Sequence, residues 1–293
     1  MSKVIVITDS TCDLSPEILK QRNIEFLPLK VCFNATEYRD VLDINPAQLF
    51  EKVEQLNTLP KSAAATINEF IDVFEKHLED KENEIIYMGI GSKLSSSYQN
   101  AFIAINSLDD DKASRVHLID SANLSTGIGL QVLKICDLRD QGLSASEIAD
   151  KMKNITPCVR AQFSVKDLTF LHKGGRCSGT IKFFGTMLRI RPILRVIDGS
   201  IILSEKIFGK YEKALDAQIK DLCDNIDKID TDYLFITHTI GDGEKDYILN
   251  TIPQEVKDKF KNIIVTDAGC VISTHCGKNT IGVIYLSKEV ITK

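Results

Sequence analysis

The sequence has no extended block of basic residues, no long apolar run and no closely spaced pair of cysteines. Its 36 basic and 41 acidic residues leave a net charge of −5, which opposes the attraction to phosphates that nucleic-acid binding requires. No segment approaches the roughly 18 consecutive apolar residues of a membrane-spanning helix. The apolar run 4–7 is too short for a signal peptide. We therefore expect a globular cytoplasmic protein with no nucleic-acid partner.

The eight cysteines are scattered along the chain without a CxxC pair. This spacing argues against a zinc site and against a disulfide framework, and it indicates reduced thiols. Cys270 and Cys276 flank His275, but no second pair is spaced to complete a metal site. We expect no metal and no cofactor.

The common catalytic motifs are also missing. There is no GxxxxGK[ST] phosphate loop, and none of the serines lies in a GxSxG motif. Asp9 follows an apolar strand, as the nucleophile of some phosphatases does, but Thr11 stands where those enzymes have a second acid. A stand-alone hydrolase or phosphotransferase that uses Asp9 or His275 stays open as the alternative function.

The first half of the chain alternates between strand and helix patterns. Apolar strands are expected at 3–8, 26–33, 84–90 and 116–119. Helix starts are marked by Ser15-Pro16, Asn45-Pro46 and the capping boxes of Thr66 with Glu69 and of Ser144 with Glu147. This alternation predicts an α/β fold with a mostly parallel sheet flanked by helices.

The pattern changes after Pro157. Strands are expected at 159–165, 193–197, 200–207, 233–237, 262–265 and 282–286, and Asp198-Gly199 marks a hairpin turn. The helices expected here, 211–226 and 244–260, are fewer. The sequence therefore predicts two domains, an N-terminal α/β domain at 1–157 and a C-terminal α+β domain at 158–293.

The serine-rich segment 91–99 is the most informative feature that is present. It follows the strand 84–90 and opens a helix, so its hydroxyl groups stand where unpaired N–H groups and the positive end of the helix dipole point. No His, Asp or Glu lies within it. The segment therefore indicates recognition of a carboxylate or phosphate rather than catalysis. Polar turns after the strands 3–8 and 116–119 are expected to lie at the same sheet edge.

Two further segments could complete an anion site. Gly174 and Gly175 precede Arg176, and glycine allows the backbone to aim that cation inward. The apolar stretch 181–194 that follows is either core or the wall of a pocket. His275 lies between two glycines, which indicates a more exposed and mobile side chain than a core histidine.

Six motifs in this order resemble the DegV family, whose members are fatty-acid-binding (FakB-type) subunits of bacterial fatty acid kinase. The resemblance covers essentially the whole chain. The motifs are Thr8-Asp9-Ser10-Thr11, the serine-rich segment ending in Tyr98-Gln99, Asp120-Ser121, Leu171 to Arg176, Arg191-Pro192-Ile193-Leu194 with Asp198-Gly199, and Thr274-His275.

The resemblance implies a two-domain protein that is not itself an enzyme. It would bury one long-chain fatty acid between its lobes and present the carboxylate to a separate kinase subunit, which forms acyl phosphate for phospholipid synthesis. A transient contact with a membrane surface fits the same role. A purely regulatory lipid sensor stays open beside the carrier.

Ser95, Arg176 and His275 match family residues at the carboxylate. Ser62 falls where the family usually has a Thr-Ser pair, although the segment 60–65 replaces the common Thr-Ser-Gln-Pro run, and Ser96 stands where glycine is common. The carboxylate site comprises Ser95, Ser62, Ser96, Arg176 and His275, with Arg176 and His275 as the positive residues. The expected acyl pocket includes Phe183, Phe184, Met187, Leu188 and Ile193. Phe208 departs from the family pattern, because an arginine is typical there.

Overall fold

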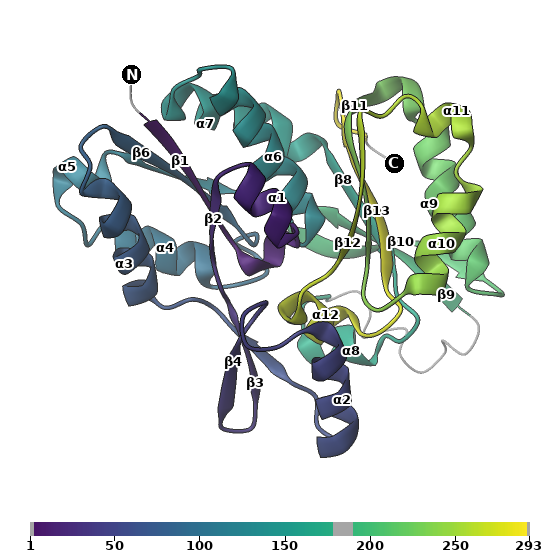
Figure 1. The fold of residues 1–293 in the computed structure, drawn as a ribbon. Coiled ribbons are helices and arrows are strands. Elements are labelled where there is room, and N and C mark those ends of the chain that lie inside the picture. Colours follow the sequence, from purple (N-terminus) through teal and green to yellow (C-terminus); the bar gives the residue numbers. More distant parts are fainter. Residues whose placement is uncertain (1–2, 178–189, 292–293) are drawn as a thin grey trace.

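The computed structural model describes residues 3–177 and 190–291, which form three sheets with helices around them (Figure 1). Most of the apolar stretch 181–194, with the predicted pocket residues Phe183, Phe184, Met187 and Leu188, lies outside the described residues.

The first sheet is parallel and has the strand order β2-β1-β6-β7. Its strands are β1 (Lys3–Asp9), β2 (Ile24–Leu27), β6 (Asn83–Gly89) and β7 (Val116–Asp120). One face is covered by α3 (Ile67–Leu78), α4 (Ser97–Ile105) and α5 (Asp110–Ala113), and the other by α1 (Pro16–Gln21), α6 (Thr126–Asp140) and α7 (Ala145–Ile155) (Figure 1). The capping boxes predicted for α3 and α7 are both present.

A small antiparallel sheet of order β4-β3-β5 lies below the parallel sheet in Figure 1. It comprises β3 (Lys30–Phe33), β4 (Thr36–Arg39) and β5 (Lys61–Ala63). Helix α2 (Pro46–Leu56) lies between β4 and β5 in the sequence. The single strand expected at 26–33 is wrong, because the chain passes from β2 to β3, and so from one sheet to another, at Pro28. Proline has no N–H for a strand ladder and so favours the break.

The third sheet is mixed and has the order β10-β9-β8-β13-β11-β12, in which only β11 and β12 pair in parallel. Its strands are β8 (Val159–Ser164), β9 (Ile190–Ile197), β10 (Ser200–Phe208), β11 (Ile229–His238), β12 (Asn262–Asp267) and β13 (Ile281–Ser287). The helices α9 (Glu212–Asp224), α10 (Asp242–Thr251) and α11 (Gln254–Lys257) cover its outer face (Figure 1). The turn predicted at Asp198-Gly199 joins β9 to β10.

Helix α6 joins the two larger sheets. It contacts β1 and β6 of the parallel sheet and β8, β11 and β13 of the mixed sheet. Most of its residues are buried, including the polar Gln131, because both sides of the helix face a sheet. The predicted fold class, a parallel α/β part followed by an α+β part, is confirmed. All described strands before residue 158 belong to the first two sheets and all later ones to the mixed sheet. The domain boundary expected at 157 stays a prediction.

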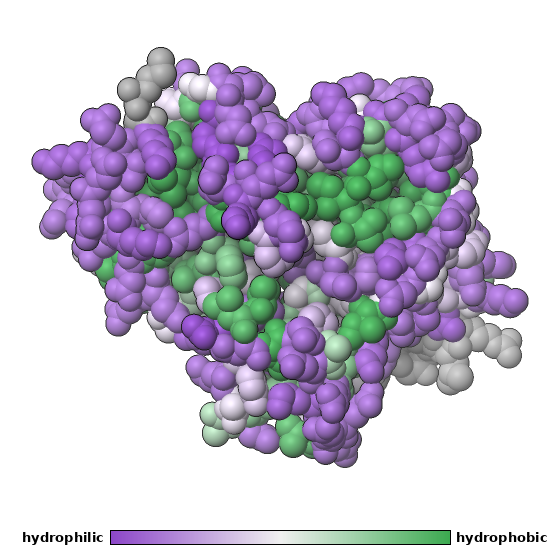
Figure 2. Space-filling view, viewed as in Figure 1, coloured by the Kyte–Doolittle hydropathy of each residue, from purple (hydrophilic) through white to green (hydrophobic). Residues whose placement is uncertain are grey.

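Hydrophilic residues cover most of the face shown in Figure 2, and hydrophobic residues are visible toward its middle, around β12. Within residues 3–177 and 190–291, no helix is long and apolar enough to cross a bilayer. The same residues contain no cluster of three or more His, Cys, Asp or Glu side chains suited to a metal ion.

Candidate functional site

A cavity of about 220 Å³ lies where the parallel sheet, the small sheet and the mixed sheet meet. Most of its described lining is apolar. The apolar residues are Leu29, Ala63, Ala64, Ile90, Leu94, Leu124, Leu171, Ile201, Val271, Ile272 and Cys276. The polar ones are Ser62, Ser95, Ser96, Arg176 and His275, the same five that the sequence predicted for the carboxylate site. Segments more than 200 residues apart in the chain thus meet at one apolar cavity.

The serine-rich segment supplies only two of its hydroxyl groups to the cavity, those of Ser95 and Ser96. Ser95 Oγ accepts a hydrogen bond from the backbone N–H of Ser97 (3.2 Å) at the start of α4. Ser92 points instead to Asp120, and its backbone N–H donates to that carboxylate (3.0 Å). The expectation that the polar turns after β1, β6 and β7 share one sheet edge is confirmed by this bond and by the bond from Ile90 N–H to Asp9 (2.9 Å).

Ser62 and His275 are in direct contact at the wall of the cavity. Ser62 lies in β5, opposite Val31 of β3, and its Oγ is 2.8 Å from His275 Nε2. His275 lies in helix α12 (Cys270–Cys276), so the expectation of a mobile loop histidine is wrong. Gly174 makes room for the ring, because a Cβ there would lie 2.4 Å from His275 Nδ1.

The structure disfavours the positive charge expected for His275. Burial of the ring, together with the nearby Arg176, lowers the pKa of His275 to about 4. The imidazole is therefore neutral at pH 7 and acts through hydrogen bonds rather than charge. Its Nδ1 is buried and has no hydrogen-bond partner among the described residues.

Arg176 is the cation of the cavity. It follows α8 (Thr169–Gly174), and Gly175 ends that helix in the left-handed region at φ 68°. Its guanidinium donates to the backbone carbonyls of Gly174 (2.7 Å) and Leu94 (3.4 Å). Within residues 3–177 and 190–291, no acidic side chain forms an ion pair with it. A permanent cation that is held by backbone carbonyls can still attract an anion.

Ile193 does not line the cavity. The residue is buried in β9, opposite Ser164 of β8. Alternate residues of a strand point to opposite faces, and Ile193 shares its face with Arg195, which bonds to Asp221 of α9. Ile193 thus lies on the α9 side of the sheet. Leu124, Leu171, Ile201 and Ile272 line the cavity instead, and nothing in the sequence distinguishes these apolar residues from the rest of the core.

Asp9, the nucleophile of the alternative function, is fully buried and is not among the cavity residues. Its carboxylate accepts hydrogen bonds from the backbone N–H groups of Thr11 and Ile90 and from the hydroxyl groups of Thr11 and Tyr87. Burial raises the pKa of this carboxyl group. The placement indicates a structural link between β1 and the end of β6.

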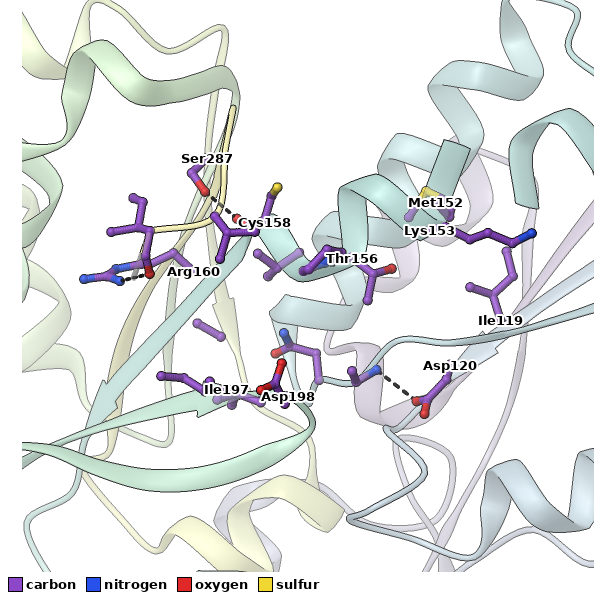
Figure 3. A pocket seen from close by; sticks show the side chains of 18 of the residues that line it. Ile119, Asp120, Met152, Lys153, Thr156, Cys158, Arg160, Ile197, Asp198 and Ser287 are labelled. Carbon is purple, nitrogen blue, oxygen red and sulfur yellow. Dashed lines mark hydrogen bonds between the residues drawn. The ribbon is translucent and has the colours of Figure 1, made fainter. Parts of the chain in front are cut away.

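A larger groove, of about 540 Å³, runs between α7, the end of β7 and the mixed sheet (Figure 3). Its two long basic side chains nearest α7 and β8 already have partners: Arg160 pairs with Asp221, and Lys153 pairs with Asp150. In Figure 3 the Arg160 side chain points away from the middle of the groove. Although this groove is larger, the smaller cavity is the better candidate site, because its polar groups converge and its cation has no acidic partner among the described residues.

The fold and the cavity define an α/β protein of three sheets with a ligand-sized cavity at their junction. A family model described as "Uncharacterised protein, DegV family" matches residues 3–288. The chain belongs to the DegV family.

Similar proteins match over the whole chain. A DegV domain-containing protein of Clostridium acetobutylicum is 35% identical over 98% of this chain and 100% of its own. Solved structures of a DegV family protein from Thermus thermophilus and of DegV from Bacillus subtilis each match with a TM-score of 0.86 and 25% identity, over 98% of this chain and 100% of theirs. The first is described in terms of its fatty acid binding, and the second as a fatty acid binding protein.

Proposed function

We propose that this protein binds a long-chain fatty acid, with the carboxylate at the five polar cavity residues and the tail along the apolar wall. The observation that carries the proposal is the meeting of Arg176, which has no acidic partner among the described residues, with three serines and a neutral histidine in an otherwise apolar cavity. The fatty acid binding described for the similar proteins from Thermus thermophilus and Bacillus subtilis supports it.

The energetics favour such a ligand. Burying about 14 methylenes at roughly 0.8 kcal/mol each supplies on the order of 11 kcal/mol of gross transfer free energy before the costs of binding. Arg176 and the hydroxyl groups would then fix the orientation of the carboxylate.

The tail extends beyond the cavity. Benzene occupies an apolar cavity of about 150 Å³, roughly 25 Å³ per carbon, so 220 Å³ accommodates about nine carbons. A narrow interior space adjoins the cavity at Leu124, Ile272 and Cys276, and Phe163 and Ile284 of the mixed sheet also line it. We propose that the remaining carbons pass between the sheets there, by displacing these side chains.

We further propose that the protein is a carrier rather than an enzyme, and that it presents the bound carboxylate to a separate ATP-dependent kinase for acyl phosphate formation. The buried, neutral His275 supports this proposal. With a pKa of about 4 it is a weak base at pH 7, and its Nδ1 has no orienting acid among the described residues. A carrier must hold a carboxylate without reacting with it. The cytoplasmic location and a transient membrane contact remain predictions from the sequence.

Native mass spectrometry and calorimetry test the binding proposal. We expect the purified protein to take up palmitate or oleate with 1:1 stoichiometry, and Ser95→Ala to bind about 5- to 15-fold more weakly, as the loss of one hydrogen bond predicts. Ser107→Ala is the matched control, because that hydroxyl group lies just after α4 and bonds to the Ile103 carbonyl of that helix. No uptake of either fatty acid by the wild type would refute the proposal.

The same samples separate the carrier from its rivals. With a fatty acid kinase subunit and ATP, the carrier should yield acyl phosphate, whereas a lipid sensor should not. Turnover of an ester or a phosphomonoester without any partner, and its loss in Asp9→Asn or His275→Gln, would instead favour the stand-alone hydrolase or phosphotransferase.

A further inference from the structure

Asp40 holds the start of the helix that carries His275. The residue follows β4 and is fully buried. Its Oδ1 accepts a hydrogen bond from the backbone N–H of Cys270 (2.7 Å), and its Oδ2 accepts one from Val271 (3.2 Å). The first N–H groups of a helix have no partner within the helix, and Gly269 at the N-cap has no side chain to offer. A carboxylate 230 residues away in the chain takes the place of the local cap.

Asp13 supports the same helix start from another element. Its Oδ1 accepts a hydrogen bond from the backbone N–H of Gly269 (2.8 Å), and its Oδ2 accepts one from the hydroxyl group of Ser125. Asp13 itself ends the short helix η1 (Ser10–Cys12) in the left-handed region, at φ 52°. The carboxylate of Asp13 therefore links its own segment to the start of α12 and to Ser125, the residue before α6.

Asp40 also connects to the opposite wall of the cavity. Its backbone N–H donates to the carbonyl of Leu29 (2.8 Å), and Leu29 lines the cavity just before β3. Ser10 links the same two residues: its hydroxyl group donates to Asp40 Oδ2 (3.1 Å) and accepts from Leu29 N–H (3.1 Å). Because β3 pairs with β5, this connection extends to Ser62.

The consequence for the site is geometric. Val271, Ile272, His275 and Cys276 form the face of α12 that lines the cavity. His275 lies one turn beyond the residues that Asp40 bonds, a rise of roughly 6 Å. If the start of α12 shifted, the imidazole of His275 would move by about the same amount as the helix start. This would break its 2.8 Å contact with Ser62.

We propose that Asp40, supported by Asp13, is a positioning residue for the carboxylate site: it fixes α12 against β3 so that His275 and Ser62 meet. The proposal rests on the fatty acid binding proposed above. Asp40 touches no ligand and acts only through His275 and Ser62.

The test replaces Asp40 by asparagine in the full-length protein. Asn keeps the shape, but its NH₂ group places a donor against N–H donors, so the bonds to α12 cannot all form. We expect the affinity for dodecanoic acid to fall at least about 10-fold while that for 1-dodecanol falls less than about 2-fold, because only the acid depends on the full polar set. Asp43→Asn, in the same segment and bonded to Arg39 rather than to α12, should leave both affinities unchanged.

A second measurement, the NMR resonances of the His275 ring nitrogens, needs no ligand. The ring nitrogen resonances of His275 should shift in Asp40→Asn and stay in place in Asp43→Asn. Equal losses for acid and alcohol, or unchanged His275 resonances, would overturn the positioning role. If Asp40→Asn does not fold, Ser10→Ala, which removes one bond to the same carboxylate, takes its place with the same criteria. If the wild type binds neither ligand, the fatty acid proposal fails, while the His275 resonances still decide the positioning role.

Discussion

His275 shows how burial can exchange one chemical role for another. In water an imidazole carries a charge below about pH 6.5, but in this cavity its pKa is about 4, because the ring is desolvated and lies near Arg176. The unfolded chain therefore binds a proton between these two values that the folded chain does not. Folding stability must fall as the pH decreases through this window, and the contribution vanishes above it.

Replacing His275 by glutamine should remove this pH dependence. At about 1.4 kcal/mol per pKa unit, the wild type should lose about 2 to 3 kcal/mol of unfolding free energy more than His275→Gln between pH 7.5 and pH 4.5. Urea unfolding of both proteins at the two pH values measures the difference, and other titrating groups cancel in the comparison. Parallel pH dependences for the wild type and His275→Gln would contradict the neutral histidine.

The serine-rich segment and Arg176 could be proposed for the site from the sequence because their chemical signals do not depend on the fold, whereas Ser62 was implied only by the resemblance to the DegV family. Serines at a helix start and an arginine after two glycines indicate an anion site wherever they lie. The state of His275 could not be predicted in this way, since it follows from which residues surround the ring. Asp13 and Asp40 were missed for a similar reason: their partners lie more than 200 positions away.

At the scale of elements, proline and glycine explain both successes and errors. The hairpin turn predicted at Asp198-Gly199 is confirmed, because the positive φ angles of Asp198 (48°) and Gly199 (73°) depend on these two residue types alone. Pro28 and Pro253 divide what the apolar pattern predicted as one strand and one helix. Helices α8 and α12 escaped prediction because each has fewer than eight residues, so the helical period barely repeats, and because partners elsewhere in the fold hold α12.

Helix α8 must end in a residue without a side chain if α12 is to carry a histidine beside it. A Cβ on Gly174 would lie 2.4 Å from His275 Nδ1, too close for any real contact. Gly174→Ala should therefore displace the ring, lower the unfolding free energy by about 1 to 3 kcal/mol and weaken fatty acid binding. Gly243→Ala in α10, where nothing lies within 4 Å of the new atom, should instead gain about 0.5 to 1 kcal/mol. Thermal unfolding and calorimetry of both variants check this, and a Gly174→Ala protein with wild-type affinity would show that the ring is not confined.

At the scale of the whole molecule, the two larger sheets share one core. The same cluster of buried residues contains Val6 and Met88 of the parallel sheet and Phe163 and Ile284 of the mixed sheet, with α6 between them. Ion pairs strengthen the junction, because Lys134 of α6 reaches Asp230 (2.7 Å) and Asp232 (2.6 Å) of β11. We therefore propose that the boundary at residue 157 separates two sheets in the chain without separating two units of stability.

Leu130 tests this proposal, because it is fully buried in α6 within the shared core. Leu130→Ala should cost about 2 to 5 kcal/mol. If the sheets unfold together, hydrogen exchange should report that same loss in β6 and in β13, since both strands become exposed only through one global opening. Lys151→Ala on the exposed side of α7 should change neither strand. Destabilisation confined to β6 would mean that the sheets open independently, and the cavity between them would then form only when both are folded.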